Sequence, residues 1–506
     1  MHKVLFLVFL WACIAACNTS PAYKQASALE EPFRPLLHFT PDSGWMNDPN
    51  GMVYHKGVYH LFFQHYPDST IWGPMHWGHA TSTNLVHWKQ QSIKLFPDSL
   101  GYIYSGSAVS DSLNTSGFAK DGKTPLVAIF THHKMEKEKD GTNTHENQSI
   151  AYSLNDGATW TKYAGNPVLK NPGHRDFRDP KVAWYAESKK WIMTLAVGDR
   201  IMFYSSPNLK DWQKESEFGV KAGEHGGVWE CPDLFSITHN GKEVWVLIVN
   251  LNPGAPNGGS GTQYFTGDFD GKNFTPHSTQ IKWMDYGPDN YAGITWSNTG
   301  DRKILIGWMS NWLYANKVPT PTWRSAMTIP RELNLQKIGR EYYLTSLPVQ
   351  ELLHIEGSET KVENLTVKGT VDLTEKLGGI NLPYLLKFDL EQAEDFSLTF
   401  SNNKGEALVI GYEKGANQYF IDRSKAGLSD FSQQFAAIHT APRLGGADGL
   451  SFTLLVDVAS VELFADNGLT SMTSIFFAQH VYDKISIRSD KGNTILKGGL
   501  RKIRVK

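Results

Sequence analysis

Ser82-Thr-Asn-Leu-Val-His-Trp88 is the stretch that decides the fold, because two later stretches repeat its shape. Ser153-Leu-Asn-Asp-Gly-Ala-Thr-Trp160 and Ser206-Pro-Asn-Leu-Lys-Asp-Trp212 each follow a strand-like run, turn on Asn or Asp, and end on tryptophan. Gly267-Asp-Phe-Asp-Gly-Lys-Asn-Phe274 is a degenerate fourth copy. Turns that recur every few tens of residues, with strands between them, are typical of β-propeller blades. The chain length around these copies holds about five four-stranded blades.

The residue composition changes after this part of the chain. From residue 359 onward tryptophan is absent, and β-branched and aromatic residues alternate with polar ones in short runs. Such alternation is typical of an antiparallel β-sandwich. We therefore expect an all-β fold: a five-bladed β-propeller over residues 33–340, a linker over 341–358, and a β-sandwich over 359–506. The second domain has no dense cluster of acids, so we assign it no catalytic role.

The N-terminus has the composition of a targeting segment. A short basic start precedes an apolar run that is too short to span a membrane as a mature helix. The small residues before Cys17 resemble a bacterial lipobox, in which the cysteine carries lipid. We expect residues 1–16 to be a lipoprotein signal peptide and residues 17–32 a tether to the outer membrane. The alternative is an ordinary secretory signal with an incidental cysteine.

Composition excludes some classes of function. A net charge of −2 gives no reason to expect nucleic acid as a partner. Of the three cysteines, only Cys231 lies outside the N-terminal segment, so no intramolecular disulfide is expected in the mature chain. No Cys/His cluster has zinc spacing, and no phosphate loop or calcium loop is present. We expect no cofactor, no metal, and a monomer whose membrane contact is the lipid anchor alone.

Three acidic motifs carry the candidate chemistry. Trp45-Met-Asn-Asp-Pro-Asn-Gly51 holds Asp48 in a stretch of turn-forming residues beside an indole. Phe177-Arg-Asp-Pro180 places Asp179 at the head of a strand, next to an arginine that favours the ionised carboxylate. Trp229-Glu-Cys-Pro-Asp-Leu-Phe235 surrounds Glu230 with apolar residues, which raises a carboxyl pKa as a general acid requires. Each motif, taken alone, is also compatible with a capping or surface carboxylate.

Considered together, the three motifs predict one shared site. Each carboxylate lies at the start of a strand in a different blade, and the inner strands of a propeller direct such residues into one central funnel. Glycoside hydrolysis needs two carboxyl groups, one ionised and one protonated.

The three motifs, in this order, resemble the signatures of the glycoside hydrolase family of invertases, levanases and inulinases, family 32. Further stretches agree with this resemblance: Tyr104-Ser-Gly-Ser107, Asp285-Tyr-Gly-Pro-Asp-Asn-Tyr-Ala292, Gly307-Trp-Met-Ser-Asn-Trp312 and Pro321–Arg331. The resemblance covers nearly the whole mature chain. It implies a five-bladed propeller followed by a β-sandwich, as the repeats indicate independently.

The resemblance also implies roles for single residues. Asp48 is the expected nucleophile, Glu230 the general acid and then base, and Asp179 an ionised carboxylate that stabilises the transition state. A retaining reaction with these two groups about 5–5.5 Å apart is expected. Matching positions imply that the fructose pocket is lined by Asn47, Gln64, Trp72, Ser105, Arg178 and Trp312. Trp308 is an alternative to Trp312, and Tyr104 departs from the Phe that many relatives have there.

The expected substrates are fructans such as levan and inulin, fructo-oligosaccharides or sucrose. Within the family, the segments around Trp312 and Trp323 are more similar to exo-acting levanases and inulinases than to cytoplasmic sucrases. An endo-levanase, a fructosyltransferase and a non-catalytic glycan-binding lipoprotein are the alternatives. The presence of all three acids disfavours the last of these.

Overall fold

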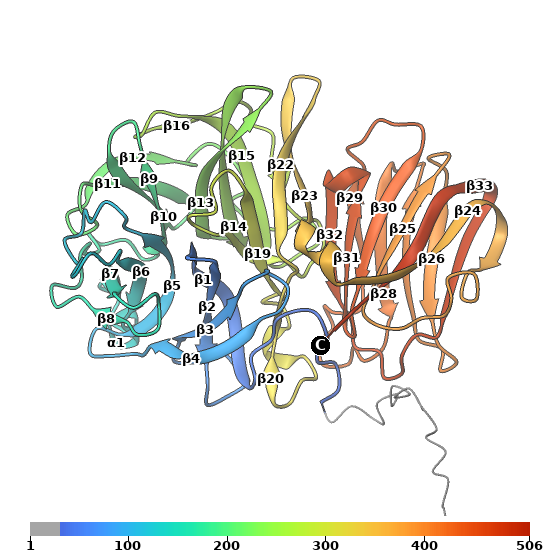
Figure 1. The fold of residues 1–506 in the computed structure, drawn as a ribbon, viewed down its shortest axis with the longest axis horizontal. Coiled ribbons are helices and arrows are strands. Elements are labelled where there is room, and N and C mark those ends of the chain that lie inside the picture. The colour runs from blue at the N-terminus through green and yellow to red at the C-terminus, as the bar shows by residue number, and fades with distance from the viewer. Residues whose placement is uncertain (1–30, 506) are drawn as a thin grey trace, which may run out of the picture.

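The computed structural model of the protein describes residues 31–505. Five antiparallel sheets within residues 44–348 surround one axis, and a second β domain lies beside them (Figure 1). The predicted five-bladed propeller followed by a β-sandwich is confirmed. Across this described range, no helix has the length and apolar character needed to cross a membrane. The expected signal peptide at 1–16, Cys17, and nearly all of the expected tether at 17–32 lie outside the described residues.

The first four blades each contain four strands that follow one another along the chain. Blade by blade, these are β1 (Gly44–His55), β2 (Val58–Tyr66), β3 (His76–Ser82) and β4 (Lys89–Leu95); β5 (Tyr102–Ser110), β6 (Leu126–His133), β7 (Glu146–Ser153) and β8 (Thr161–Lys162); β9 (Arg178–Tyr185), β10 (Lys190–Val197), β11 (Arg200–Ser206) and β12 (Gln213–Phe218); and β13 (Val228–His239), β14 (Lys242–Asn252), β15 (Gly261–Phe269) and β16 (Phe274–Pro276), with β17 (Lys282–Trp283) pairing with β15. A short helix, α1 (Met135–Lys139), lies between β6 and β7.

The fifth blade contains β18 (Tyr291–Thr295), β19 (Lys303–Met309), β22 (Arg331–Ile338) and β23 (Glu341–Pro348), with β21 (Ala326–Met327) on β19. The ring is closed by β20 (Trp323–Arg324), which pairs in parallel with the start of β1. Strand β23 occupies residues that the sequence analysis assigned to the linker. It belongs to the blade because every residue of β22 pairs with it and Leu344 is buried in the propeller core. The connection to the second domain is the short 3-10 helix η2 (Gln350–Ile355).

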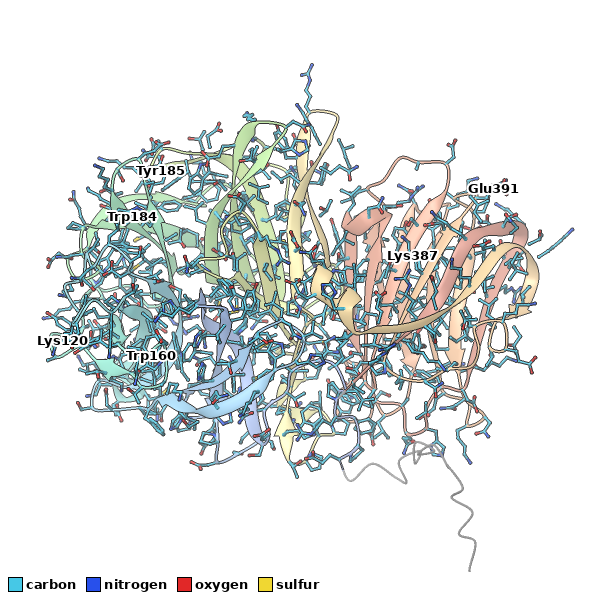
Figure 2. The ribbon with its side chains drawn as sticks, in the orientation of Figure 1. Lys120, Trp160, Trp184, Tyr185, Lys387 and Glu391 are labelled. Carbon is cyan, nitrogen blue, oxygen red and sulfur yellow. The ribbon has the colours of Figure 1, made fainter. Side chains whose placement is uncertain are left out.

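The repeated turns have a shared physical basis. In each full copy a serine hydroxyl donates to the side chain of the Asn two residues later, at Asn84, Asn155 and Asn208. The Asn side chain then accepts backbone N–H groups two to four residues further on. Each turn joins the third strand of a blade to the fourth. Its tryptophan packs against neighbouring elements: Trp160, labelled in Figure 2, lies edge-on to Phe62 of the preceding blade, 5.5 Å between ring centroids.

The innermost strands carry irregularities at their starts. The pairing register shifts between Met46 and Pro49 on β1, between Ile103 and Gly106 on β5, and between Glu230 and Asp233 on β13. Similar shifts occur at the starts of β9 and β18. A β-bulge turns side chains away from the regular alternation and is enriched beside active sites. All five inner strands are therefore bent at the same end of the axis.

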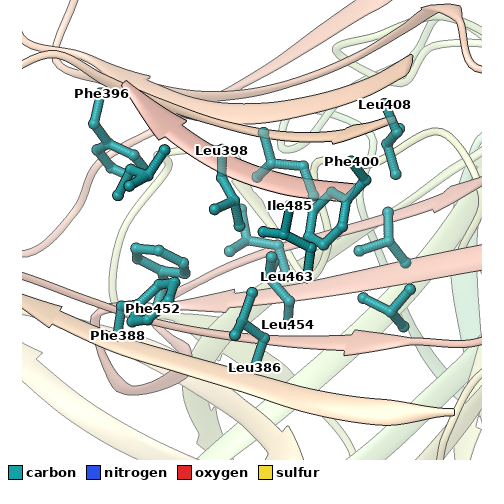
Figure 3. Packing of buried hydrophobic residues seen from close by; sticks show 14 of the residues in the cluster. Leu386, Phe388, Phe396, Leu398, Phe400, Leu408, Phe452, Leu454, Leu463 and Ile485 are labelled. Atoms are coloured by element: carbon teal, nitrogen blue, oxygen red, sulfur yellow. The ribbon is translucent and has the colours of Figure 1, made fainter. Parts of the chain in front are cut away.

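The second domain is one continuous ten-stranded antiparallel sheet that folds over its own core. Its strands are β24 (Glu356–Asp372), β25 (Tyr384–Leu390), β26 (Phe396–Ser401), β27 (Ala407–Glu413), β28 (Gln418–Lys425), β29 (Ile438–Pro442), β30 (Leu450–Val456), β31 (Ser460–Ala465), β32 (Thr470–Ile475) and β33 (Lys484–Ile503). Inside it, Phe452 stacks on Phe396 and lies edge-on to Phe388, and Figure 3 shows the three residues together. The 20-residue β33 pairs with β24, β25 and β26 and so connects both halves of the sheet.

Buried ion pairs join the two domains. Arg331 of the propeller contacts Asp285 at 2.8 Å and also the carboxylate of Glu462 on β31. Arg423 on β28 contacts Asp289 of the propeller at 2.7 Å. The side chains of all five residues are fully buried. Each buried charge therefore has a partner of opposite sign, and the Arg331–Glu462 and Arg423–Asp289 pairs cross between the domains.

His38 adds a second buried contact between the domains. Its Nδ1 lies 2.8 Å from Asp457, and its Nε2 lies 2.7 Å from Glu462. Asp457 also accepts the backbone N–H groups of Leu36 and Leu37 at 3.0 and 2.9 Å. The hydrogen bonds to both carboxylates outweigh burial and raise the pKa of His38 to about 9. This imidazole is therefore charged at neutral pH.

Candidate active site

A cavity of about 270 Å³ opens where the inner strands of the propeller begin. It is lined by all of the residues that the sequence analysis placed in a pocket: Asn47, Asp48, Gln64, Trp72, Ser105, Arg178, Asp179, Glu230 and Trp312. These side chains come from four of the five inner strands, from β2, and from two loops. The bulges at the strand starts turn them toward one space.

Asp48, on β1, is held by donors on both carboxylate oxygens. The Ser105 hydroxyl of β5 donates to Oδ2 at 2.7 Å, and the Asn47 amide donates to Oδ1 at 3.0 Å. Asn47 is itself held, because its Oδ1 accepts the indole N–H of Trp45 at 2.7 Å. Burial raises the pKa of Asp48, and the bonds from Ser105, Asn47 and Cys231 oppose that rise. The donors therefore favour the ionised form and fix the orientation of the carboxylate.

Asp179, on β9, adopts a left-handed backbone conformation with φ of 64°. Its Oδ2 accepts the backbone N–H of Cys231 at 3.0 Å, and the Cys231 thiol lies between Asp179 and Asp48, 3.6 and 3.5 Å from their oxygens. Burial raises the pKa of Asp179 to about 8, because the nearby Arg178 does not offset burial and the charges of Glu230 and Asp48. The sequence analysis expected Arg178 to keep Asp179 ionised. Burial instead outweighs Arg178 and raises the pKa of Asp179.

Glu230, on β13, is contacted by a cation and by a phenol. Arg178 Nη2 donates to its Oε1 at 3.0 Å, and the Tyr291 hydroxyl of β18 hydrogen-bonds its Oε2. Burial raises the pKa of Glu230, and the charge of Asp48 acts in the same direction, whereas Arg178 and Tyr291 lower it. Since a phenol can donate to a carboxylate or accept from a carboxylic acid, Tyr291 suits both protonation states of Glu230.

Aromatic side chains form the walls. Trp312 lines the cavity and stacks on Trp45, with centroids 5.8 Å apart and planes at 26°. Trp308 is fully buried behind it, 4.9 Å from the Trp312 ring, so of the two candidates the structure places Trp312 at the pocket. Tyr104 also lines the cavity, and its ring stacks on His133 at 4.2 Å.

The structure adds residues that sequence reasoning did not single out. Glu146, at the start of β7, is buried and lies 3.2 Å from Arg178 Nη1, and Asp176 lies 2.6 Å from the same nitrogen. Arg178 favours the ionised form of Glu146, whose pKa is lowered to about 2 despite burial. Glu146 ends a charged run, 131–146, that has the composition of a solvated loop. Tyr291 was quoted only as part of a longer motif, with no role.

Carboxyl groups of unequal environment facing one small polar pocket, with aromatic walls, define a glycosidase site. Comparison with known proteins gives the family. Residues 38–348 match the glycosyl hydrolases family 32 N-terminal domain, and residues 351–505 match the family 32 C-terminal domain. The chain therefore belongs to glycosyl hydrolase family 32, and it is a glycosidase of the fructofuranosidase, levanase and inulinase type.

Individual relatives agree in sequence and in shape. The chain is 43% identical to the levanase of Bacillus subtilis, over 98% of this chain and 74% of that protein. The crystal structure of exo-inulinase from Aspergillus awamori superposes with a TM-score of 0.86 at 36% identity, over 94% of this chain and 99% of that one. A β-fructofuranosidase from Schwanniomyces occidentalis, complexed with fructosyl-erythritol, gives 0.86 at 32% identity, over 95% and 99%.

Proposed function

We propose that the protein releases fructose from the ends of levan or inulin chains by a retaining mechanism with a covalent fructosyl-enzyme. The observation that carries the proposal is the pairing of Asp48 and Glu230 across one pocket. Asp48 is surrounded by donors that favour its ionised form, and Glu230 by burial and a phenol that allow it to hold a proton. This is the difference in environment that a nucleophile and a general acid require.

In the first step, the Asp48 carboxylate attacks the anomeric carbon of the terminal fructosyl unit. Glu230 gives its proton to the departing glycosidic oxygen, so the bond to the rest of the chain breaks without releasing an alkoxide. In the second step, the Glu230 carboxylate takes a proton from water, and the resulting hydroxide attacks the same carbon and frees Asp48. Two inversions at one carbon give retention.

Asp179 and Arg178 assist from the pocket wall. We assign Asp179 hydrogen bonds to the hydroxyls of the fructosyl ring, and in its ionised form the stabilisation of positive charge on that ring at the transition state. Its fixed position follows from the Cys231 backbone N–H that holds Oδ2. Arg178 positions Glu230 and is itself held by Glu146 and Asp176.

The dimensions of the pocket support action at chain ends. A volume of about 270 Å³ lies at the lower edge of the ~300–1,000 Å³ range of small-molecule sites. Such a pocket suits a terminal sugar and its neighbour rather than the middle of a polymer. The similarity to a levanase and to an exo-inulinase supports the choice of fructans as substrates.

The test is incubation of the purified protein with levan, inulin and sucrose, with products resolved by thin-layer chromatography. Fructose as the sole early product from the polymers supports the proposal. A ladder of oligosaccharides indicates endo cleavage, and no product from any substrate indicates a binding protein. ¹³C NMR of the first-formed fructose checks the mechanism, because a retaining enzyme releases the β-furanose form first and an inverting enzyme does not.

We further propose that the protein is an outer-membrane lipoprotein attached through Cys17. The lipobox-like residues before this cysteine support the proposal. Cys17→Ala should move the protein from the membrane fraction to the soluble fraction and abolish labelling with radioactive palmitate. A variant that stays in the membrane fraction contradicts the assignment.

A further inference from the structure

Three potential metal ligands lie together in one wall of the pocket. His133, His145 and Glu146 each offer a ligand atom, and these atoms all lie within 4.8 Å of one another. The three residues are exposed by only 3%, 4% and 1%. The sequence separates His133 from His145 by a loop of eleven residues without zinc spacing, so only the fold brings them together.

The ligands are held by rigid backbone. His133 ends β6, Glu146 begins β7, and the two residues are directly paired across the strands. The carbonyl oxygen of His145 accepts the backbone N–H of Lys134 at 2.8 Å, which closes the ladder one residue further. Ligands on paired strands keep their geometry better than ligands on loops. Their spacing is therefore set by the sheet and not by the exposed helix α1.

The imidazole of His145 has no hydrogen-bond partner among residues 31–505. Its Nδ1 is buried and unpaired, and its ring lies edge-on to the ring of His133, with centroids 5.2 Å apart and planes at 79°. A buried polar nitrogen without a partner costs free energy and calls for a ligand. That ligand must accept an imidazole lone pair beside a carboxylate.

His133 has the surroundings of a metal-bound histidine. Its Nδ1 lies 3.3 Å from Glu146, its Nε2 lies 3.2 Å from Glu138, and Tyr104 stacks on its ring. A metal-bound imidazole typically donates its other N–H to a carboxylate, which fixes the ring and its tautomer. Nδ1 is the nitrogen that lies on the side of Glu146 and can bind the ion with it, while Glu138 faces Nε2.

We propose that His133, His145 and Glu146 form a binding site for Zn²⁺ or another divalent ion of similar ligand preference. Two imidazoles and one carboxylate are a ligand set that suits Zn²⁺, and water completes four-coordination. Ca²⁺ and Mg²⁺ prefer all-oxygen sites, so the two nitrogens select against them.

All three ligands line the pocket, and Glu146 also connects the site to the catalytic residues through Arg178. Glu146 Oε1 accepts a hydrogen bond from Arg178 Nη1 at 3.2 Å, and Arg178 Nη2 donates to Glu230 at 3.0 Å. A bound ion draws on the same carboxylate and adds positive charge beside Arg178, so it weakens the hold of Glu146 on the arginine. The ion therefore inhibits turnover. This coupling rests on the proposed function, whereas the binding of the ion does not.

The binding test uses untagged full-length protein freed of metal by chelation and titrated with ZnCl₂ by calorimetry. One saturable ion is expected in the wild type, with an affinity at least tenfold weaker in His145→Ala and unchanged in His480→Ala, an exposed histidine of the second domain. X-ray absorption at the zinc edge should show nitrogen and oxygen ligands at about 2.0–2.2 Å. No saturable binding, or equal binding by wild type and His145→Ala, overturns the proposal. Circular dichroism checks that the variants fold.

The coupling test follows fructose release during the same titration. Wild-type activity should fall over the concentration range in which the ion binds and return on addition of EDTA. The residual activity of His145→Ala should require at least tenfold more ZnCl₂ for the same fractional inhibition. Saturation of the site without any change in turnover refutes the coupling to Arg178 while the metal site stands. A protein inactive on every fructan would refute the proposed function and leave the calorimetric result unaffected.

Discussion

The pocket and the interface between the domains both bury carboxyl groups and arginines, yet the two regions treat them differently. At the interface burial is outweighed at two carboxyl groups: the pKa of Glu462 is lowered by Arg331 and His38, and that of Asp457 by His38 and backbone N–H groups. At Asp289 burial still raises the pKa against the opposing charge of Arg423. In the pocket, burial raises the pKa of Asp48, Asp179 and Glu230, and Arg178 opposes that rise at Asp179 and Glu230. The interface pairs its buried carboxylates with arginines or His38, whereas the three pocket carboxyl groups keep raised pKa values although Arg178 is nearby.

This contrast places the carboxyl groups with raised pKa values mainly in the pocket. Groups of perturbed pKa gather at active sites because catalysis needs protons held against their ordinary preference. Matched buried pairs instead give a defined docking geometry, although they add little stability compared with apolar packing. The following changes test whether the two regions are as different as their contacts indicate.

The largest effect is expected from the two reacting groups of the pocket. Asp48→Asn removes the nucleophile, and Glu230→Gln removes a proton donor worth about 10²–10⁴ in rate. Each should reduce fructose release by several orders of magnitude while the melting temperature stays close to that of the wild type. Initial rates on inulin measure this, with the exposed Asp268→Asn of the same propeller as a control that keeps full activity. Near-normal turnover of either variant would show that the roles are assigned wrongly.

Removing one matched charge at the interface should have the next largest effect. Arg331→Ala leaves Asp285 buried without its cation and leaves Glu462 with His38 alone. Breaking such a pair costs about 3–5 kcal/mol of unfolding free energy. Urea denaturation measures the loss. Arg488→Ala, which breaks an exposed pair with Asp490, should leave the denaturation midpoint unchanged. An equal midpoint for wild type and Arg331→Ala would mean that the interface is not held by these charges.

His38 gives the interface a pH dependence of known sign. Its pKa is raised from 6.5 to about 9 in the folded protein, so its contribution is fully present below pH 6.5 and is lost as pH rises through 9. A rise of this size corresponds to about 3 kcal/mol. His38→Asn should therefore be destabilised most at pH 6, and the deficit should shrink toward pH 9.5. Urea titrations across this range measure it, and a deficit that is constant with pH contradicts the assignment.

The smallest effect on stability is expected from removing the buried carboxyl group of Asp179 from the pocket. The pKa of Asp179 is raised to about 8, so its contribution to stability is present below pH 4 and is lost as pH rises through 8. Asp179→Asn removes that loss. It should match the wild type in stability at pH 4, be more stable than the wild type at pH 8, and lose activity at both. Thermal unfolding against pH measures the gain, and parallel curves for the two proteins would exclude a strained carboxylate at this position.

Much of the fold could be predicted because its signals are local. The Ser-x-Asn turns and their tryptophans lie within eight residues of one another, and each of them forms the predicted turn between the third and fourth strands of a blade. The nine predicted pocket residues also meet, because the motifs lie at strand starts and the inner strands of a propeller converge. The linker was placed too early because β23 is recognised only through its pairing with β22.

What could not be predicted depends on contacts between distant segments. Glu146 joins the pocket through its cross-strand pairing and through Arg178, 32 residues away, and the charged run around it gives no such signal. Arg331 and Glu462 are 131 residues apart in two different domains. Burial and the charges of Glu230 and Asp48 raise the pKa of Asp179, and these three residues come from three separate sequence motifs. Local patterns specify elements, whereas charge balance belongs to the assembled site.

The chain enters the propeller through a clamp, because the backbone N–H groups of Leu36, Leu37 and His38 all donate to Asp457 of the second domain at 2.9–3.3 Å. This clamp lies ahead of β1 and therefore ahead of Asp48. A mechanical load applied at the N-terminal end of the described chain is carried by the second domain before it reaches the first blade. The second domain thus protects the strand that carries Asp48 from a force applied at this end. Pulling experiments should detach residues 36–38 from Asp457 before any blade opens.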